Sequence, residues 1–360
     1  DTITISDVVP FGEKENNAYI TGAGPRGLAR ANLFLPGRSP VRVILPDNAW
    51  EMGFSTFAAD GDLSVTSISR RAGTENGIMK RYETLLPPGA SVTYRIYADV
   101  FRGQWQDGLR LMFSDRWLYD LERFDETLYK RDDLKWIRSS YLMILQMAWD
   151  RQFFDRFTGE EGFAYYLSEY NSLFGHVDVY GIWPTWPRLG LDERNQWDLY
   201  RDLPGGTASL RRISTEARSA GCRFFIAYNP WDKSTREEDH LGGMARIIAE
   251  TRADGVVLDT EGRSSAELQQ AADTVHPGVV MYSEGMPVVK DMPGIVAARV
   301  HNALYLSPEL NLNKLIRTDF AIFRVADAGE DILHREIAVA LFNGYGTELN
   351  MFRPGGRGEE

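Results

Sequence analysis

Three acidic residues follow two short apolar runs in the middle of the chain, and their types and spacing could do chemistry. The run Val256–Leu258 ends in Asp259 with Glu261 close behind, and the run Val279–Tyr282 is followed by Glu284. Cleavage of a glycosidic bond needs one carboxyl group to protonate the leaving oxygen and a second to attack the sugar or activate water. The spacing therefore predicts a pair of working carboxyl groups at two neighbouring strand ends.

The two best candidates are expected to differ in ionisation. Asp259, the shorter side chain on a strand end, would stay ionised, and Glu284, beside Tyr282 and Met286, would be held protonated by burial. Glu261 is an alternative acid, or only a carboxylate at the start of a helix. Any of the three could instead cap a helix or brace a rim.

A helix is predicted between the two apolar runs. Ser264 or Ser265 can cap it, and one of its faces would be lined by Leu268, Ala271, Ala272 and Val275. Apolar strands of this length without strict alternation, separated by a helix, are typical of a parallel sheet covered on both sides. In a parallel barrel, functional groups lie where the strands end. Both carboxylates would then project into one mouth.

The same alternation of strand and helix runs from residue 140 onward, with helices predicted at 162–174, 208–221, 240–253 and 336–346. Counting the central pair, eight strands are predicted, at residues 141–149, 177–183, 222–228, 256–258, 279–282, 295–300, 320–324 and 347–352. Eight such strands predict an α/β fold, a (β/α)8 TIM barrel over residues 140–360. Its last helix is expected to be missing or to lie beyond residue 360.

The amino-terminal part of the chain has a different character. Residues 1–105 contain alternating and β-branched segments separated by turn clusters, which predicts an amino-terminal β-sandwich domain. Residues 106–139 carry aromatic and charged side chains at roughly helical spacing. We interpret them as a helical linker between the two domains.

One glycine-rich run in the amino-terminal part resembles a cofactor motif. Gly22–Gly27 matches the glycine spacing of a dinucleotide-binding turn, and Asp47 lies 20 residues after Gly27. The preceding apolar run is short, however, and the next fifty residues are β-like rather than alternating strand and helix. We favour a hairpin or loop, and a nucleotide-dependent enzyme is kept as a third hypothesis.

Aromatic, amide and acidic side chains gather after the second and third predicted barrel strands. Flat indole rings stack on sugar faces, and Asp, Asn and Arg pair with sugar hydroxyls, so the pattern favours a carbohydrate pocket over simple loop packing. Trp197 belongs to the same group of tryptophans. The candidate substrate-binding residues are Trp183, Trp186, Trp231, Asp232, Asn229, Tyr228, Asp150 and His301.

Composition narrows the function classes. A formal net charge of -11 argues against a nucleic-acid partner, and no apolar segment is long enough to span a membrane. The five histidines lack metal-ligand spacing and Cys222 is the single cysteine, so neither a metal site nor a cofactor is expected. The chain starts without Met, so a secreted or periplasmic protein whose leader has been removed is expected, with a cytoplasmic one as the alternative.

Four segments resemble a known family. VYGIWPTWP, FFIAYNPWD, GVVLDTEG and VVMYSEGMP, behind a β domain, resemble a TIM-barrel glycoside hydrolase, similar in plan to the α-galactosidase and α-amylase groups. The resemblance implies that Asp259, at the end of the fourth strand, is the nucleophile. In the amylase group the general acid is a Glu after the next strand, which Glu284 matches. The α-galactosidase group has an Asp after the sixth strand, where this chain has His301.

Two leading hypotheses therefore differ in function. The first is a glycosidase acting on an oligo- or polysaccharide through Asp259 and Glu284. The second is a carbohydrate-binding barrel without activity, in which the two carboxyl groups are badly spaced for catalysis. A separation of about 5 Å predicts retention of anomeric configuration, and about 6.5 to 9.5 Å predicts inversion.

Overall fold

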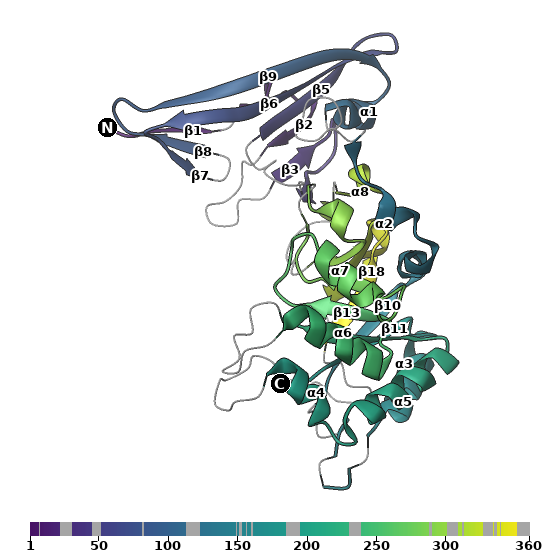
Figure 1. Cartoon of the computed structure of the whole chain (residues 1–360). Helices are drawn as coiled ribbons and strands as arrows, with labels where there is room; N and C mark the ends of the chain where they lie inside the picture. Colours follow the sequence, from purple (N-terminus) through teal and green to yellow (C-terminus); the bar gives the residue numbers. More distant parts are fainter. Residues whose placement is uncertain are drawn as a thin grey trace. The chain divides into compact units, whose positions relative to one another are not determined.

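The computed structural model divides the chain into two compact units (Figure 1). Unit 1 comprises Asp1–Phe124, Val288–Lys290 and Leu304–Thr318, and unit 2 comprises Asp125–Pro287, Asp291–Ala303 and Asp319–Glu360. The structure describes residues 1–6, 8–21, 31–44, 52–80, 83–112, 123–148, 150, 153–155, 157–159, 161–184, 195–229, 239–287, 290–300, 309–311, 313–326, 334, 337–338 and 340–350.

Unit 1 is built from two sheets. The smaller has the strand order β1-β8-β7, and the larger has the order β16-β4-β3-β2-β5-β6-β9. All their pairings are antiparallel except that of β16 with β4. The strands are β1 (Ile3–Ser6), β2 (Ala18–Thr21), β3 (Ala31–Phe34), β4 (Val41–Ile44), β5 (Met52–Asp60), β6 (Leu63–Glu75), β7 (Ile78–Lys80), β8 (Glu83–Leu86), β9 (Ser91–Arg102) and β16 (Glu309–Asn311). The β-rich character predicted for this region is confirmed, and its packing as a sandwich stays a prediction.

A late segment of the chain contributes to this unit. Residues 304–318 fall within the range predicted for the barrel, but they belong to unit 1, where β16 pairs with β4 and is followed by the short helix α8 (Asn313–Ile316). Nothing local in a three-residue strand distinguishes it from a barrel loop. Its assignment depends on tertiary pairing that sequence patterns do not report.

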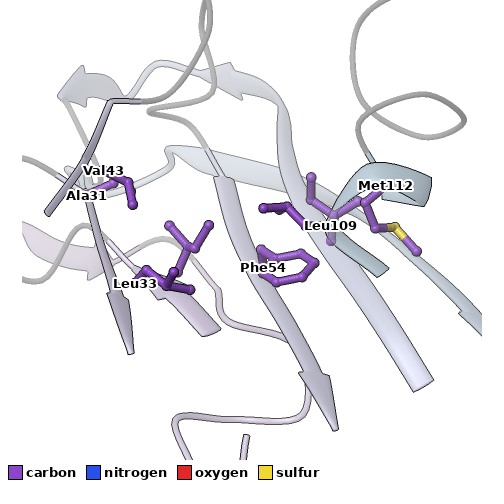
Figure 2. Packing of buried hydrophobic residues seen from close by; sticks show 8 residues of the cluster. Ala31, Leu33, Val43, Phe54, Leu109 and Met112 are labelled. Carbon is purple, nitrogen blue, oxygen red and sulfur yellow. The ribbon is translucent and has the colours of Figure 1, made fainter. Parts of the chain in front are cut away.

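The core of unit 1 lies between the larger sheet and helix α1 (Trp105–Leu111). Phe54 of β5 and Ile68 of β6 are fully buried, and Leu109 and Met112 from the helix end pack against them (Figure 2). Apolar positions spaced three residues apart lie on one face of a helix, which explains why this short helix covers the sheet.

The glycine-rich run connects two antiparallel strands. β2 and β3 pair with Tyr19 opposite Phe34 and Thr21 opposite Asn32, and residues 22–30 between them lie outside the described part of the chain. A dinucleotide fold requires a strand leading to a helix and then to a parallel strand. The pairing agrees with the predicted hairpin and contradicts the nucleotide-dependent alternative.

Unit 2 contains a closed barrel of eight parallel strands, in the order β10-β11-β12-β13-β14-β15-β17-β18. Each strand overlaps one of the eight predicted from the sequence, and β18 closes the barrel by pairing with β10. The strands are β10 (Leu142–Met147), β11 (Val179–Trp183), β12 (Arg223–Tyr228), β13 (Gly255–Leu258), β14 (Val280–Ser283), β15 (Ala297–Val300), β17 (Ala321–Ala326) and β18 (Gly346–Asn350). The predicted (β/α)8 barrel behind a β-rich region is confirmed.

Helices connect successive strands on the outside of the barrel (Figure 1). They are α3 (Phe163–Phe174), α4 (Gln196–Arg201), α5 (Gly206–Ser219), α6 (His240–Thr251) and α7 (Ala266–Asp273). Each turns an apolar face inward, as in α6, where Met244, Ile247 and Ile248 are buried. That spacing is the three-and-four repeat of an amphipathic helix, which is why four of the five segments were predicted. The exception is α4, which lies in a segment interpreted from the sequence as a long loop. The segment predicted as a helix at 336–346 lies partly outside the described residues, so that prediction stays open.

The amino-terminal end of the barrel is covered by the segment that precedes β10. This segment holds α2 (Thr127–Lys130) and a 3-10 helix, η4 (Asp132–Ser139). The Tyr129 hydroxyl donates to the Ile295 carbonyl at 2.8 Å, and the Arg223 guanidinium lies over the Trp136 ring, 5.0 Å from its centroid. A second 3-10 helix, η5 (Met292–Gly294), precedes β15. The opposite, carboxyl end of the barrel is the end that carries the candidate carboxylates.

Aromatic rings fill the barrel interior where glycine leaves room. Phe225 and Tyr282 meet with ring centroids 6.3 Å apart, and Tyr282 and Phe323 meet at 5.6 Å. A Cβ at Gly255 would lie 2.2 Å from the Phe225 ring, and one at Gly346 would lie 2.5 Å from the Phe323 ring. Any larger residue at these two positions would overpack the interior. The barrel is therefore a packed core below its mouth rather than a pore.

Among the helices that the structure describes, none is both long and apolar enough to cross a membrane.

Candidate active site

Asp259 and Glu284 lie side by side because the backbone hydrogen bonds between neighbouring barrel strands extend one residue past the ends of β13 and β14. The Asp259 amide donates to the Tyr228 carbonyl at 2.9 Å, and the Glu284 amide donates to the Leu258 carbonyl at 3.0 Å. Since β13 and β14 pair with Leu258 opposite Ser283, the next residues of the two strands are also opposite each other. Neighbouring parallel strands lie about 4.8 Å apart, and in-register side chains share one face of the sheet.

The Asp259 carboxyl group is buried and electrostatically unusual. Its side chain is only 4% exposed, and one carboxyl oxygen, Oδ2, has no hydrogen-bond partner. Burial raises the pKa of Asp259 from 3.8 to about 8, with further contributions from a hydrogen bond to Glu284 and from the charge of Glu284. Asp259 therefore carries a proton at neutral pH.

Glu284 is held on both of its carboxyl oxygens. Oε1 accepts a hydrogen bond from Nη2 of Arg299 on β15, and Oε2 accepts one from the Thr260 amide. Two donors on two oxygens, one of them a guanidinium, are the bonding pattern of an ionised carboxylate. Glu284 is partly exposed, whereas Arg299 is almost fully buried.

The ionisation is the reverse of the one expected from the sequence. We predicted an ionised Asp259 and a protonated Glu284, whereas burial raises the pKa of Asp259 and the hydrogen bond from Arg299 favours the ionised form of Glu284. The physical reason is Arg299, whose position could not be derived from its place in the chain. Because the two carboxyl groups interact directly, they behave as a pair that holds one proton between them.

Glu261 turns away from this pair. Its Oε1 accepts hydrogen bonds from the Gly262 amide at 3.0 Å and the Arg263 amide at 2.8 Å, so the side chain braces its own loop. The turn is set by Thr260, whose φ of +54° is in the left-handed region that β-branched residues rarely adopt. This contact matches the bracing role that was the alternative for Glu261 and argues against its use as the acid.

Two predicted substrate-binding residues lie at the same end of the barrel. Trp183 is the last residue of β11, and the Arg299 guanidinium lies over its ring, 5.5 Å from the centroid. Asn229 follows β12, and its backbone is clamped by Gln196, which donates to the Asn229 carbonyl and accepts from its amide, both at 2.9 Å. The predicted contacts of these two side chains with sugar stay predictions.

The surroundings of the other described candidates can also be stated. Tyr228 stacks on Trp197 of α4 with ring centroids 5.4 Å apart, and it meets His240 of α6 edge-on. Trp197 is fully buried, so the interpretation of this tryptophan as part of a sugar pocket is wrong, and the packing argues against Tyr228 as a sugar contact. Asp150 is half-buried in the loop after β10, where its carbonyl accepts from the Phe153 amide.

Four predicted site residues lie outside the described part of the chain. They are Trp186, Trp231, Asp232 and His301. Their predicted roles stay predictions.

The sequence reasoning missed a buried polar network beneath the pair. Arg299 donates from Nη1 to Oε1 of Glu348 on β18 at 2.6 Å, and the Tyr282 hydroxyl donates to Oε2 of the same carboxylate. Glu348 is completely buried. A signal was present in the chain, because AARV and TELN each place one charged residue inside an otherwise strand-like run, where burial demands a partner.

Within the described residues, no group of three or more His, Cys, Asp or Glu side chains is arranged to hold a metal ion. The arrangement instead offers proton chemistry: one protonated carboxyl group, one charged carboxylate and a fixed guanidinium.

Neither a family model nor a curated protein matches the sequence. Among solved structures, an α-N-acetylgalactosaminidase from Bifidobacterium bifidum, NagBb in complex with GalNAc, matches with a TM-score of 0.51 and 11% identity over 93% of this chain and 69% of that chain. A cycloalternan-degrading enzyme from Trueperella pyogenes matches with a TM-score of 0.42 and 9% identity, over 99% of this chain and 62% of that chain.

The first of these similarities establishes a shared fold. The chain has the barrel and the β-rich amino-terminal unit of a barrel glycoside hydrolase, which confirms the resemblance seen in the sequence at the level of fold. Fold alone does not determine chemistry. The class of protein is therefore a (β/α)8 barrel with a β-rich unit, and its activity must be argued from the site.

Proposed function

We propose that the protein is a glycoside hydrolase whose catalytic pair is Asp259 and Glu284. The observation that carries the proposal is the placement of two neighbouring carboxyl groups at the carboxyl end of the barrel, with Glu284 held by Arg299 and Asp259 buried beside it. Glycoside hydrolysis needs one carboxyl group protonated and the other ionised at the same pH. The substrate would be an oligo- or polysaccharide bound at the barrel mouth.

The proposed reaction begins when a sugar ring separates the two carboxyl groups. As the ring enters, and before the contact between the carboxyl groups opens, the shared proton passes to Glu284, which leaves Asp259 ionised to face the positive charge that develops at the anomeric carbon. Glu284, which is longer and partly exposed, then protonates the leaving oxygen while Asp259 attacks the anomeric carbon. Water activated by Glu284 finally hydrolyses the glycosyl–Asp259 ester.

The short separation favours retention of anomeric configuration. In the free protein a hydrogen bond to Glu284 helps to raise the pKa of Asp259, which places the two groups nearer to the roughly 5 to 5.5 Å of a retaining pair than to the wider spacing of an inverting pair. A small outward movement of Glu284 reaches the retaining spacing. The roughly 6.5 to 9.5 Å of an inverting pair would require a much larger displacement.

The proposal is tested by screening the protein on nitrophenyl glycosides and polysaccharides, with Glu261→Gln as a matched control. Glu261 belongs to the same loop but binds only backbone amides, so its amide variant should keep the activity. Asp259→Asn and Glu284→Gln should lose it. Equal activity in all four proteins would contradict the proposal.

Azide assigns the two roles. With Asp259→Gly, azide should attack the anomeric carbon from the side of the missing carboxylate and give a glycosyl azide of inverted configuration. With Glu284→Gly, azide should attack the glycosyl–Asp259 ester and give the retained configuration. The opposite pair of products would exchange the roles of Asp259 and Glu284.

The direct contact between the two carboxyl groups also favours a second candidate, a barrel that binds carbohydrate without cleaving it. In that case the mouth would bind a sugar while the pair stayed closed. Calorimetric binding without turnover on the same panel would support this candidate over the hydrolase.

A further inference from the structure

The buried network of Arg299, Glu348 and Tyr282 lies directly behind the carboxyl pair and has no role in the reaction as proposed above. Glu348 sits at the third position of β18, inside the barrel and with no exposed surface. Both of its carboxylate oxygens accept hydrogen bonds, one from the guanidinium and one from the phenol. Burial of a carboxylate is costly unless it is paired and hydrogen-bonded, and Glu348 meets both conditions.

We propose that Glu348, supported by Tyr282, is a positioning residue that sets how strongly Arg299 acts on the Asp259–Glu284 pair. This inference rests on the proposed function only in its consequence for catalysis, because the electrostatic coupling itself exists in the free protein.

The single positive charge of Arg299 is shared between two carboxylates, those of Glu348 and Glu284. Nη1 is held by Glu348 at 2.6 Å, and Nη2 reaches Glu284. Glu348 therefore cancels much of the positive charge that would otherwise fall on the catalytic pair. Without that cancellation, the guanidinium would drive both carboxyl groups to ionise, and the pair would lose its proton at neutral pH.

The charged and titratable groups around the pair can be named strand by strand. β13 leads to Asp259, β14 carries Tyr282 and leads to Glu284, β15 carries Arg299, and β18 carries Glu348. On β17, Phe323 faces the barrel interior, where it packs against Tyr282. Successive residues of a strand face opposite sides of the sheet, so the next residue, Arg324, faces the outside of the barrel. The interior positions of β10, β11 and β12 are uncharged at Met143, Leu145, Met147, Gly181, Trp183, Phe225 and Ala227.

Burial first, and then the charge of Glu348, raise the pKa of Tyr282 well above 10, so its hydroxyl remains a donor. Burial opposes the charge of Arg299, but Glu348, Tyr282 and Glu284 outweigh it and raise the pKa of Arg299, so it remains a cation. Only the catalytic pair is left to titrate near neutral pH.

Two substitutions should move the pKa of Asp259 in opposite directions. Glu348→Gln keeps the shape, and its single amide oxygen can still accept from Arg299 while its NH2 group donates to the Tyr282 oxygen, but it removes a negative charge, so the pKa of Asp259 should fall by about one unit. Tyr282→Phe keeps the charge of Glu348 but removes a donor to it, which leaves more of its negative charge unscreened. The pKa of Asp259 should then rise slightly.

The experiment is a carboxyl titration of the full chain by carbon NMR with labelled aspartate, in which Asp259→Asn assigns the signal. Asp254→Asn is the matched control, because Asp254 is an equally buried carboxylate at the other end of β13. Its loss should leave the Asp259 titration unchanged. Simple loosening of the barrel would admit water and lower the pKa in both test variants.

Opposite shifts in Glu348→Gln and Tyr282→Phe support the inference, and shifts in one direction, or no shift, overturn it. If Glu348→Gln does not fold, the sign of the shift in Tyr282→Phe still decides, because loosening would lower the pKa. If Tyr282→Phe does not fold, Glu348→Asp, which keeps the charge, replaces it: a fall in Glu348→Gln without a fall in Glu348→Asp supports the inference, and equal falls overturn it. The titration needs no substrate, so it separates the two claims. A protein with shifted titrations and no hydrolysis would contradict the proposed function alone, and a hydrolase with unshifted titrations would contradict this inference alone.

Discussion

The two ends of β13 carry the same residue in two different surroundings. Asp254 precedes the strand and Asp259 follows it, and each is 4% exposed. The carboxylate of Asp254 accepts hydrogen bonds from Arg218 at 3.1 Å, from Arg223 at 3.3 Å and from the Phe224 amide at 3.0 Å. Asp259 has an unpartnered oxygen and a second carboxyl group beside it.

Burial alone therefore does not decide what an aspartate does in this barrel. At the amino-terminal end, cations and an amide satisfy the carboxylate, which ties the strand to its neighbours. At the carboxyl end, a like-charged neighbour forces a shared proton. The first arrangement favours stability, and the second keeps a reactive group available at the cost of stability.

The largest expected effect is a difference in hydrolysis rate between the Asp259→Asn and Asp254→Asn variants. Asp259→Asn should reduce hydrolysis by at least about a thousandfold, because an amide can neither attack carbon nor act as a base, while the unfolding free energy is not lowered. Asp254→Asn should keep turnover but lower the unfolding free energy by about 2 kcal/mol, because it leaves buried donors poorly paired. Rates and urea denaturation of both variants check this, and a matching loss of activity in both would remove the distinction.

The loss of activity in Glu284→Gln should depend on the leaving group of the substrate. Loss of a general acid typically costs about a hundredfold to ten-thousandfold, and it matters most when the leaving oxygen is a poor one. We expect a large decrease for an alkyl glycoside or disaccharide and a small decrease for a dinitrophenyl glycoside. Equal decreases for both kinds of substrate would show that Glu284 is not the proton donor.

The stability of the folded protein should depend on pH through Asp259. The pKa of Asp259 is about 8 in the folded protein and about 3.9 when unfolded. The folded state thus retains a proton that the unfolded state releases, so this stabilisation is complete below about pH 4 and is lost as the pH rises to about 8. Wild type should lose about 2 kcal/mol relative to Asp259→Asn across this window, because the pair shares the effect.

Urea denaturation of both proteins at pH 5 and pH 8 measures that difference. A constant difference between them would mean that the Asp259 carboxyl group titrates at its ordinary pKa in the folded barrel.

Trp183→Ala should have the smallest effect. If its indole contacts the sugar, KM should rise about tenfold, with little change in kcat and a smaller relative loss of stability. Substrate titration and thermal melting of the variant provide the check. A large drop in melting temperature with unchanged KM would assign Trp183 to the support of Arg299 instead.

The barrel was predictable because its signals are local. Each predicted run of three to nine residues overlaps a strand, and the helix between Asp259 and Glu284 formed with its expected face buried at Ala272. The location of the candidate acids was also predictable, because residues that directly follow parallel barrel strands all lie at the carboxyl end of the barrel. Register then brought Asp259 and Glu284 together.

The electrostatics were not predictable, because they depend on residues far apart in the sequence. Arg299 and Glu348 are 49 positions apart, and only barrel closure places them in contact beneath Glu284. The same holds for Glu261, whose direction depends on the left-handed turn at Thr260. A sequence shows which side chains are charged, but the partner that decides their ionisation comes from tertiary structure.

The most direct test of the central claim is covalent trapping. The reagent is a 2-deoxy-2-fluoro glycosyl fluoride of the sugar for which screening finds turnover. Its 2-fluoro group slows hydrolysis of the glycosyl–enzyme ester more than formation of the ester, so the ester accumulates. Mass spectrometry of the digested protein should find the fluorosugar on the peptide that contains Asp259, and no adduct should form in Asp259→Asn. Labelling of another residue, or inactivation of Asp259→Asn at the wild-type rate, would contradict the proposed catalytic pair.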